Sequence, residues 1–238
     1  MNDLWVVDLQ RMPYAEALEL QRNVARDRIS GAISEDVLLL VEHPPVVTLG
    51  RSSKQKNLIS SPDFLQSRGV ELFEVERGGD VTFHGPGQLV GYPIIDLKRH
   101  KLDLHWYLRQ VEEAIIRVLS RYGISAERST GYTGVWTAGR KITSIGVHAR
   151  DWVTWHGFAM NVITDLTYFD LIVPCGIQDV EMTSIAKEIT LRGEEIPGDL
   201  SVTSAGRVTA EAFAEVFGLA PVESSLADLM PPAESTLG

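Results

Sequence analysis

The chain has few of the residues that would cross-link it or hold it in a membrane. Cys175 is its only cysteine, which excludes an intramolecular disulfide and leaves burial, reactivity or metal ligation for the thiol. No segment approaches about 20 uninterrupted apolar residues, and residues 1–13 lack a basic region followed by a long apolar stretch. We therefore expect a soluble cytoplasmic protein that does not contact a membrane.

Positive charge is also scarce. The 22 basic residues are outnumbered by 32 acidic ones, giving a net charge of −10, so general binding to DNA or RNA is not expected. Neither G-x-G-x-x-G nor G-x-x-x-x-G-K-[ST] occurs, and no second cysteine or H-x-x-x-H spacing suggests a metal site. One local basic groove in an acidic protein remains compatible with this balance.

The chain is long and apolar enough to bury one substantial core, because 44% of its 238 residues are hydrophobic. Runs of strands with helices inserted, without strict alternation, predict an α+β fold with a mixed or antiparallel central sheet flanked by helices. We expect a single domain over residues 1–218. The polar, proline-rich residues 219–238 predict a loosely ordered tail.

Periodicity and capping residues locate the expected elements. Strands are predicted over residues 4–9, 36–42, 46–49 and 70–76, with several short strands between 124 and 163, including one over 152–162. Helices are predicted over residues 14–29, after Ser61-Pro62, over 104–122 with Asp103 as its cap, and over 209–217. Ala138 and Gly139 predict a hairpin turn that places Lys141 at the start of a strand.

The stretch from Arg77 to Leu97 contains five glycines and two prolines between two strand-like runs. Glycine permits positive φ and close backbone approach, while proline fixes φ and removes a donor, so the loop is shaped as well as flexible. Arg77, Asp80 and His84 place charge and an imidazole among these small residues. The pattern is typical of a ligand-contacting loop, although a turn between two strands with a surface arginine explains it about as well.

Cys175 follows Pro174 and precedes Gly176, which favours a bent backbone that displays the thiol. A lone cysteine is otherwise most often a small buried hydrophobe. A nucleophilic cysteine needs its thiolate stabilised, and an ammonium at about 4 Å contributes about 4 kcal/mol at an effective dielectric of about 20. Lys141 could supply it, or could point into water from its hairpin. Histidine is the commoner partner of a catalytic thiol, and His84 or His156 could fill that role.

Four ordered motifs together resemble the lipoyl (octanoyl) transferase family. They are R-G-G-x-x-T-F-H-G-P-G-Q-L-V-x-Y-P from Arg77 to Pro93, G-V-W followed by Lys141-Ile142 and Ser144-Ile145-Gly146, W-x-x-x-H-G-F-A from Trp152 to Ala159, and P-C-G-I from Pro174 to Ile177. They spread over about half of the chain. The resemblance implies the fold of the lipoate and biotin protein ligases.

The resemblance also implies an activity: transfer of an octanoyl group from acyl carrier protein to a lysine of a lipoyl domain, as the first step of protein lipoylation. The acceptors would be lipoyl domains of 2-oxoacid dehydrogenase E2 subunits and the glycine cleavage H protein. Cys175 would carry the acyl group as a thioester with Lys141 as its partner, and no cofactor or ATP would be needed. The implied substrate-binding residues are Arg77, Gly78, Gly79, Asp80, Val81, Thr82, Phe83, His84, Ser144, Ile145, Gly146, Gly157, Phe158 and Ala159.

Three alternatives remain open at this point. An ATP-using lipoate or biotin ligase would not need the cysteine, a silent module would bind the carrier or lipoyl domains without forming an acyl adduct, and a hydrolase would release free octanoate. The oxyanion donors are also open, with a backbone N–H near Cys175 or Gly176 and others from the glycine-rich loop or residues 144–146 as candidates. Because the expected protein partners are acidic, a local basic surface including Arg51, Lys54 and Lys56 is expected.

Overall fold

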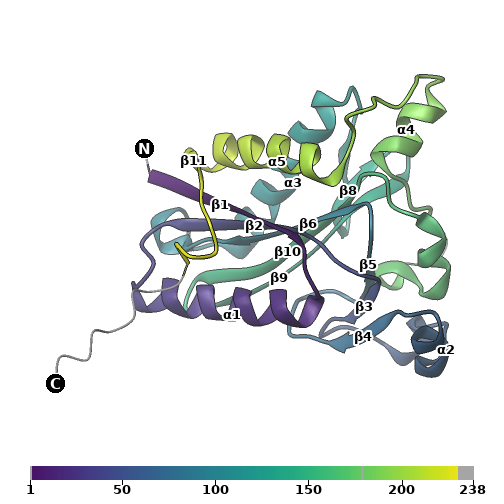
Figure 1. The fold of residues 1–238 in the computed structure, drawn as a ribbon, viewed down its shortest axis with the longest axis horizontal. Coiled ribbons are helices and arrows are strands. Elements are labelled where there is room, and N and C mark those ends of the chain that lie inside the picture. Colours follow the sequence, from purple (N-terminus) through teal and green to yellow (C-terminus); the bar gives the residue numbers. More distant parts are fainter. Residues whose placement is uncertain (1, 178–179, 230–238) are drawn as a thin grey trace.

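The fold is built on one large mixed sheet and one small sheet, as seen in a computed structural model that describes residues 2–177 and 180–229 (Figure 1). The large sheet consists of β1 (Asn2–Arg11), β2 (Asp36–Glu42), β6 (Gln88–Ile94), β7 (Glu127–Ser129), β8 (Tyr132–Thr137), β9 (Arg140–Arg150), β10 (Val153–Asn161) and β11 (Leu219–Glu223). The small sheet consists of β3 (Val46–Leu49), β4 (Glu71–Glu74) and β5 (Val81–His84).

Strand order in the large sheet is β11-β1-β2-β6-β10-β9-β8-β7. The strand β1 pairs in parallel with β2 and β11, and every other neighbouring pair is antiparallel. In the small sheet β3 pairs in parallel with β4 and antiparallel with β5. This confirms the predicted α+β class with a mixed central sheet.

Helices cover both faces of the large sheet. The helices are α1 (Tyr14–Ser30), α2 (Pro62–Ser67), α3 (Leu104–Arg121), α4 (Ile185–Leu191) and α5 (Val202–Phe217). In Figure 1, α3 and α5 lie on one face and α1 on the other, while α2 lies beside the small sheet. The sheet is therefore buried on both faces in its centre, which explains the continuous apolar run of β2.

Alternation along β2 divides its side chains between two cores. Leu38 and Leu40 pack with residues of α3 and α5, whereas Val37, Leu39 and Val41 pack with residues of α1. Successive side chains of a strand point to opposite faces, so one apolar run serves both layers.

Capping residues explain where the helices begin. Asp103 accepts a hydrogen bond from the Trp106 N–H at the start of α3, as predicted. The prediction for the last helix was wrong at its start, because α5 begins at Val202 rather than at residue 209. A reciprocal capping box between Ser201 and Ser204 fixes this start, and it carries serine where the usual signature has glutamate or glutamine.

The expected loose tail is wrong for its first residues. Residues 219–223 form β11, which pairs with β1 and extends the sheet, and Leu229 is 3% exposed. Backbone pairing with β1 and the burial of Leu219 explain the order of this segment. The predicted tail residues 230–238 lie outside the described residues.

The glycine-rich stretch joins the two sheets. β5 belongs to the small sheet and β6 to the large sheet, and residues 85–87 connect them. Close approach of neighbouring atoms explains several of its glycines, with aromatic side chains beside Gly85 and Gly91 and backbone beside Gly87. A Cβ on Gly87 would lie 2.7 Å from the Ile163 carbonyl oxygen, and Gly87 also has a φ of +78°. The junction of the two sheets thus requires glycine, because a side chain would collide with neighbouring atoms.

Gly157 in β10 is another position where the strands leave no room. A Cβ there would lie 2.2 Å from the Gly91 carbonyl oxygen, which is rigid backbone in β6. We expect Gly157→Ala to lower the free energy of unfolding by about 1–3 kcal/mol, measured by urea denaturation. The matched control is Gly198→Ala, which meets no atom within 4 Å and should be nearly neutral. Equal stability of the two variants would contradict this account of the packing.

Candidate active site

The only thiol of the chain lies on a tight turn over Pro174–Gly176. Cys175 has a φ of 56° and Gly176 a φ of 67°, so two consecutive residues adopt the left-handed conformation. A non-glycine residue rarely does so, and such strain occurs often at functional sites. The N–H groups of Gly176 and Ile177 donate to the carbonyls of Val173 and Pro174. The bent backbone predicted around Cys175 is confirmed, and the thiol is half-buried.

Lys141 reaches this turn from the start of β9. Its Nζ lies 2.9 Å from the Cys175 Sγ, although the two residues are 34 positions apart. The lysine is 1% exposed, so the alternative of a hairpin lysine in water is wrong. Its ammonium also lies 4.9 Å from the centroid of the Trp136 ring. Among the described residues no carboxylate lies within ion-pair distance of Lys141, which leaves the sulfur as its partner in this contact.

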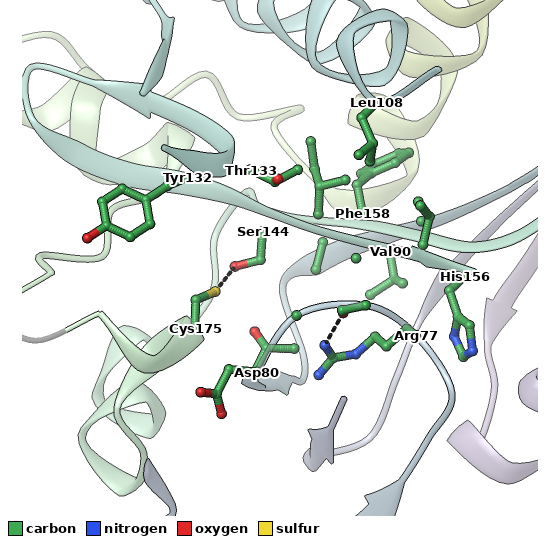
Figure 2. Close-up of a pocket in the computed structure, with 18 of the residues that line it drawn as sticks. Arg77, Asp80, Val90, Leu108, Tyr132, Thr133, Ser144, His156, Phe158 and Cys175 are labelled. Carbon is green, nitrogen blue, oxygen red and sulfur yellow. Dashed lines mark hydrogen bonds between the residues drawn. The ribbon is translucent and has the colours of Figure 1, made fainter. Parts of the chain in front are cut away.

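Backbone hydrogen bonds fix Lys141 from both sides. Its N–H donates to the Glu181 carbonyl at 2.8 Å, and its carbonyl accepts from the Thr183 N–H at 2.9 Å. Ser144 lies on the same strand, and its Oγ is 3.7 Å from the Cys175 Sγ, as the dashed line in Figure 2 shows. The thiol therefore faces one ammonium and one hydroxyl from β9.

A pocket of about 240 Å³ opens beside Cys175 and Lys141. Twelve of the fourteen predicted substrate-binding residues line it: Arg77, Gly78, Gly79, Asp80, Thr82, His84, Ser144, Ile145, Gly146, Gly157, Phe158 and Ala159. Val81 and Phe83, the other two, do not line it. They point to the opposite face of β5, where they pack in the core of the small sheet with Val47 and Phe169.

The inner part of the pocket is apolar and shaped by glycine. Figure 2 shows Val90, Leu108 and Phe158 around the space beyond Ser144. A Cβ on Gly146 would lie 2.7 Å from the Gly78 carbonyl oxygen, so the absence of that atom lets β9 pass beside the glycine-rich loop. An apolar slot that begins at a thiol is suited to a fatty acyl chain.

Arg77 forms part of the wall as a buried cation. Its guanidinium donates to the Thr48 carbonyl at 2.7 Å, to the Thr48 hydroxyl at 2.8 Å and to the Gly78 carbonyl at 3.1 Å. Burial lowers its pKa below the ordinary value. These bonds tie the glycine-rich loop to β3, so a surface arginine, the simpler interpretation of this residue, is wrong.

His84 and His43 are buried and hydrogen-bonded to other side chains, whereas His156 only approaches a carboxylate. The His84 Nδ1 lies 2.9 Å from the Gln88 Oε1, and the His43 Nε2 lies 2.7 Å from the Tyr92 hydroxyl. Burial lowers the pKa of His84 to about 3 and that of His43 to about 4. His156 faces Glu76, with 3.6 Å between its Nε2 and the carboxylate.

The Cys175 Sγ makes no hydrogen bond to an imidazole in the part of the chain that the structure describes. The alternative in which His84 or His156 activates the thiol is therefore not supported by the geometry. Both histidines instead line the pocket, at a position where burial keeps an imidazole neutral.

Other pocket residues were missed from the sequence because they come from distant elements. They include Tyr14 of α1, Leu108 of α3, Tyr92 of β6 and the segment 131–133 before and in β8. Their apolar or aromatic character is shared with core residues, so no local signal distinguishes them. Asn57 was also missed, although it is 6% exposed and supports the thiol turn.

Asn57 connects three parts of the site. Its Nδ2 donates to the Asp80 carboxylate at 2.6 Å, and its carbonyl accepts from the Val173 N–H at 2.8 Å. A Cβ on Gly176 would lie 2.9 Å from the same Nδ2 and 2.5 Å from the Asp80 carboxylate. Asn57 and Asp80 thus pack directly against the turn that carries Cys175.

Within the described residues no cluster of His, Cys, Asp and Glu side chains is arranged to hold a metal ion. None of the described helices is long and apolar enough to cross a bilayer. The geometry thus defines a class: an α+β catalytic domain with a paired thiol and ammonium at the opening of an apolar pocket.

Comparison with known proteins specifies this class. Residues 13–214 match the family model described as the lipoyl protein ligase A/B catalytic domain. An octanoyltransferase of Nostoc punctiforme is 47% identical over 225 residues, covering 93% of this chain and 91% of the relative. An octanoyltransferase of Rubrobacter xylanophilus is 50% identical, covering 89% and 94%. The chain belongs to the lipoyl protein ligase A/B catalytic domain family.

Solved structures agree on the fold. A lipoate-protein ligase A bound with ATP superposes with a TM-score of 0.76 at 15% identity, covering 96% of this chain and 91% of that one. A lipoate protein ligase from Thermoplasma acidophilum gives a TM-score of 0.71 at 17% identity, covering 96% and 89%. Identities this low show the shared fold alone.

The buried histidines should make stability depend on pH. In the unfolded chain, histidines take up protons below about pH 6.5. In the folded protein, His84 stays unprotonated until the pH falls to its pKa of about 3. The folded state therefore loses stability as pH falls from 7 to 5, by about 2 kcal/mol from His84 alone. Most carboxylates remain ionised in this window.

The free energy of unfolding should fall between pH 7 and pH 5 in the unchanged protein. In His84→Gln we expect this fall to be about 2 kcal/mol smaller. Urea denaturation at both values measures the difference. His105→Gln, on the exposed surface of α3, serves as the control and should follow the unchanged protein. If the His84 and His105 variants respond alike, the assignment of a buried neutral imidazole is wrong.

Removing the Asn57 side chain should loosen the thiol turn. Asn57→Ala leaves the Asp80 carboxylate without its amide donor, and we expect the free energy of unfolding to fall by about 1.5–3 kcal/mol in urea denaturation. Asn23→Ala, which removes a surface bond to Arg26 on α1, should change stability by less than about 0.5 kcal/mol. An Asn57→Ala protein as stable as the Asn23 variant would refute the supporting role.

Proposed function

We propose that this protein is an octanoyltransferase that moves an octanoyl group from acyl carrier protein to a lysine of a lipoyl domain through a thioester on Cys175. The contact of 2.9 Å between the Lys141 Nζ and the Cys175 Sγ carries the proposal. Family membership and relatives named octanoyltransferase, at 47–50% identity over most of the chain, support the reaction class. We place the reaction in the cytoplasm.

The first half-reaction uses the thiolate as nucleophile. The Cys175 thiolate attacks the thioester carbonyl of the donor, the bond from that carbonyl carbon to the carrier sulfur breaks, and the Lys141 ammonium gives its proton to the departing thiolate. One thioester replaces another, so the exchange is close to energy-neutral and needs no ATP or cofactor. Burial of Lys141 beside the sulfur supports this role because a desolvated ammonium stabilises a nearby thiolate strongly.

The second half-reaction restores the starting charges. The neutral amine of the acceptor lysine attacks the acyl-enzyme, neutral Lys141 accepts a proton from the attacking nitrogen, and the bond between the acyl carbon and the Cys175 sulfur breaks. The product is a stable amide, and the enzyme returns to an ammonium beside a thiolate. A single lysine therefore acts first as acid and then as base.

The oxyanion formed in both steps needs hydrogen-bond donors. The Gly176 N–H, one of the candidates named from the sequence, already donates to the Val173 carbonyl at 2.9 Å. The Ser144 hydroxyl, 3.7 Å from the Cys175 Sγ, is better placed than Gly176 to reach an oxygen on the attacked carbon.

The acyl chain would occupy the apolar part of the pocket. Each buried methylene contributes about 0.8 kcal/mol, so the finite space bounded by Val90, Leu108 and Phe158 supports selection by chain length. Gly146 and Gly157 line this space, and a side chain at either position would collide with the backbone beside it.

An ATP-dependent ligase reaction is the competing assignment, because a lipoate-protein ligase A bound with ATP shares the fold. Octanoyl transfer from octanoyl carrier protein to a lipoyl domain, assayed without ATP, separates the two. The proposal expects transfer by the unchanged protein and none by Cys175→Ala. Full activity of Cys175→Ala, or activity only with free octanoate and ATP, would instead support the ligase.

Lys141 should control the reactivity of the thiol. We expect Lys141→Met, which keeps most of the side-chain volume, to slow alkylation of Cys175 by iodoacetamide at pH 7 by at least about tenfold, because about 1.4 kcal/mol of thiolate stabilisation is a factor of ten. Lys187→Met, which removes a surface ammonium paired with Glu181, is the matched control. An unchanged alkylation rate in Lys141→Met would remove Lys141 from the proposed mechanism.

A further inference from the structure

The segment from Arg51 to Lys56 concentrates positive charge beside the site. It holds Arg51, Lys54 and Lys56 and no acidic residue, a charge of +3, so the rest of the chain carries −13. All three side chains are exposed. No carboxylate of the described residues lies within 4.0 Å of their charged groups. Most other surface cations pair with a carboxylate, such as Lys101 with Asp103 and Lys187 with Glu181.

Backbone hydrogen bonds tie this segment to both halves of the site. At its start, the Arg51 N–H donates to the Arg77 carbonyl at 3.0 Å and the Ser52 N–H donates to the Gly79 carbonyl at 3.1 Å. Just after its end, the Asn57 carbonyl accepts from the Val173 N–H at 2.8 Å. The charged segment thus bridges the glycine-rich loop and the turn that carries Cys175.

A surface groove follows the same segment. Arg51 and Lys54 line it together with Leu49, Leu58 and Val75, and its volume is about 560 Å³. Gly50 belongs to this groove, and a Cβ on Gly50 would lie 2.4 Å from the carbonyl oxygen of Gly79, which lines the thiol pocket. The groove and the pocket are therefore separated by a single layer of backbone.

We propose that the cationic segment Arg51–Lys56 is the docking surface for the acyl donor, and that it receives the acidic carrier and its phosphate-linked arm. This inference rests on the proposed function. The two protein substrates differ in the group that they bring to Cys175. The donor arm is attached through an anionic phosphodiester, whereas the acceptor brings a lysine side chain. Both partners are expected to be acidic, so their net charges do not separate them. The three cations attract the phosphodiester of the donor arm and repel the ammonium of an incoming lysine, so we assign the segment to the donor.

Exposed cations of this kind raise the rate of productive encounter with an acidic partner more than they change the chemical step. The expected signature is an effect on kcat/KM for the carrier that disappears with an uncharged donor. Salt should weaken it as well, because exposed charges are screened over about 8–10 Å at physiological ionic strength.

The test compares two triple variants of equal charge change. The first carries Arg51→Gln, Lys54→Gln and Lys56→Gln. The control carries Arg26→Gln, Lys101→Gln and Arg207→Gln, at surface positions that do not line the thiol pocket. Each is assayed at low ionic strength with octanoyl carrier protein and with the octanoyl thioester of N-acetylcysteamine, which is small and uncharged.

We expect the first variant to lose on the order of tenfold in kcat/KM for octanoyl carrier protein. Its kcat, its KM for the lipoyl domain and its rate with the small donor should each change less than about twofold. Its kcat/KM should also become nearly independent of salt, while the control behaves as the unchanged protein. Equal kcat/KM in both variants would overturn the docking surface.

Two further outcomes would also overturn the assignment. A raised KM for the lipoyl domain would give the segment to the acceptor, and an equal loss with the small donor would give it a structural role at the thiol. Failure of the proposed function is distinguishable from all of these, because the unchanged protein would then form no octanoyl product from either donor.

Discussion

The site depends on one contact between an ammonium and a sulfur that are distant in the sequence. Lys141 is buried at the start of β9, and the Cys175 Sγ at 2.9 Å is its partner there. Two features of the backbone create the contact. Strand pairing fixes Lys141 between Glu181 and Thr183, and the left-handed conformation at Cys175 turns the thiol toward it. The pocket, the glycine-rich loop and the Asn57–Asp80 pair all surround this contact.

The fold itself does not decide the chemistry. A lipoate-protein ligase A bound with ATP has the same architecture at 15% identity, so the residues at the site, and not the architecture, favour thioester exchange. Arg77 is bonded to the backbone and side chain of Thr48 rather than left free at the surface, and His84 is a buried neutral imidazole bonded to Gln88. The thiol and its ammonium are the reactive groups that remain in contact at the opening of the pocket.

Much of the fold was predictable, because local patterns carry it. The strands 36–42 and 46–49 were predicted with their observed bounds, and α3 followed from its apolar spacing and the cap at Asp103. The differences from the predictions have physical reasons. Strand alternation turns Val81 and Phe83 away from the pocket, and an unusual serine capping box starts α5 early. Residues 219–223 belong to a polar, proline-rich C-terminal stretch that suggested a tail, although they complete the sheet beside β1.

The contact of Lys141 with Cys175 could be named as a hypothesis from the sequence but not established, since spacing says nothing about which distant side chains meet. The central claim, that this contact makes Cys175 an acyl carrier, is tested most directly by mixing the protein with octanoyl carrier protein in the absence of acceptor and sequencing the peptide that contains Cys175 by mass spectrometry. The account predicts one octanoyl group on that sulfur for each carrier thiol released. Release of carrier thiol with no octanoyl group on Cys175 at any time would contradict it.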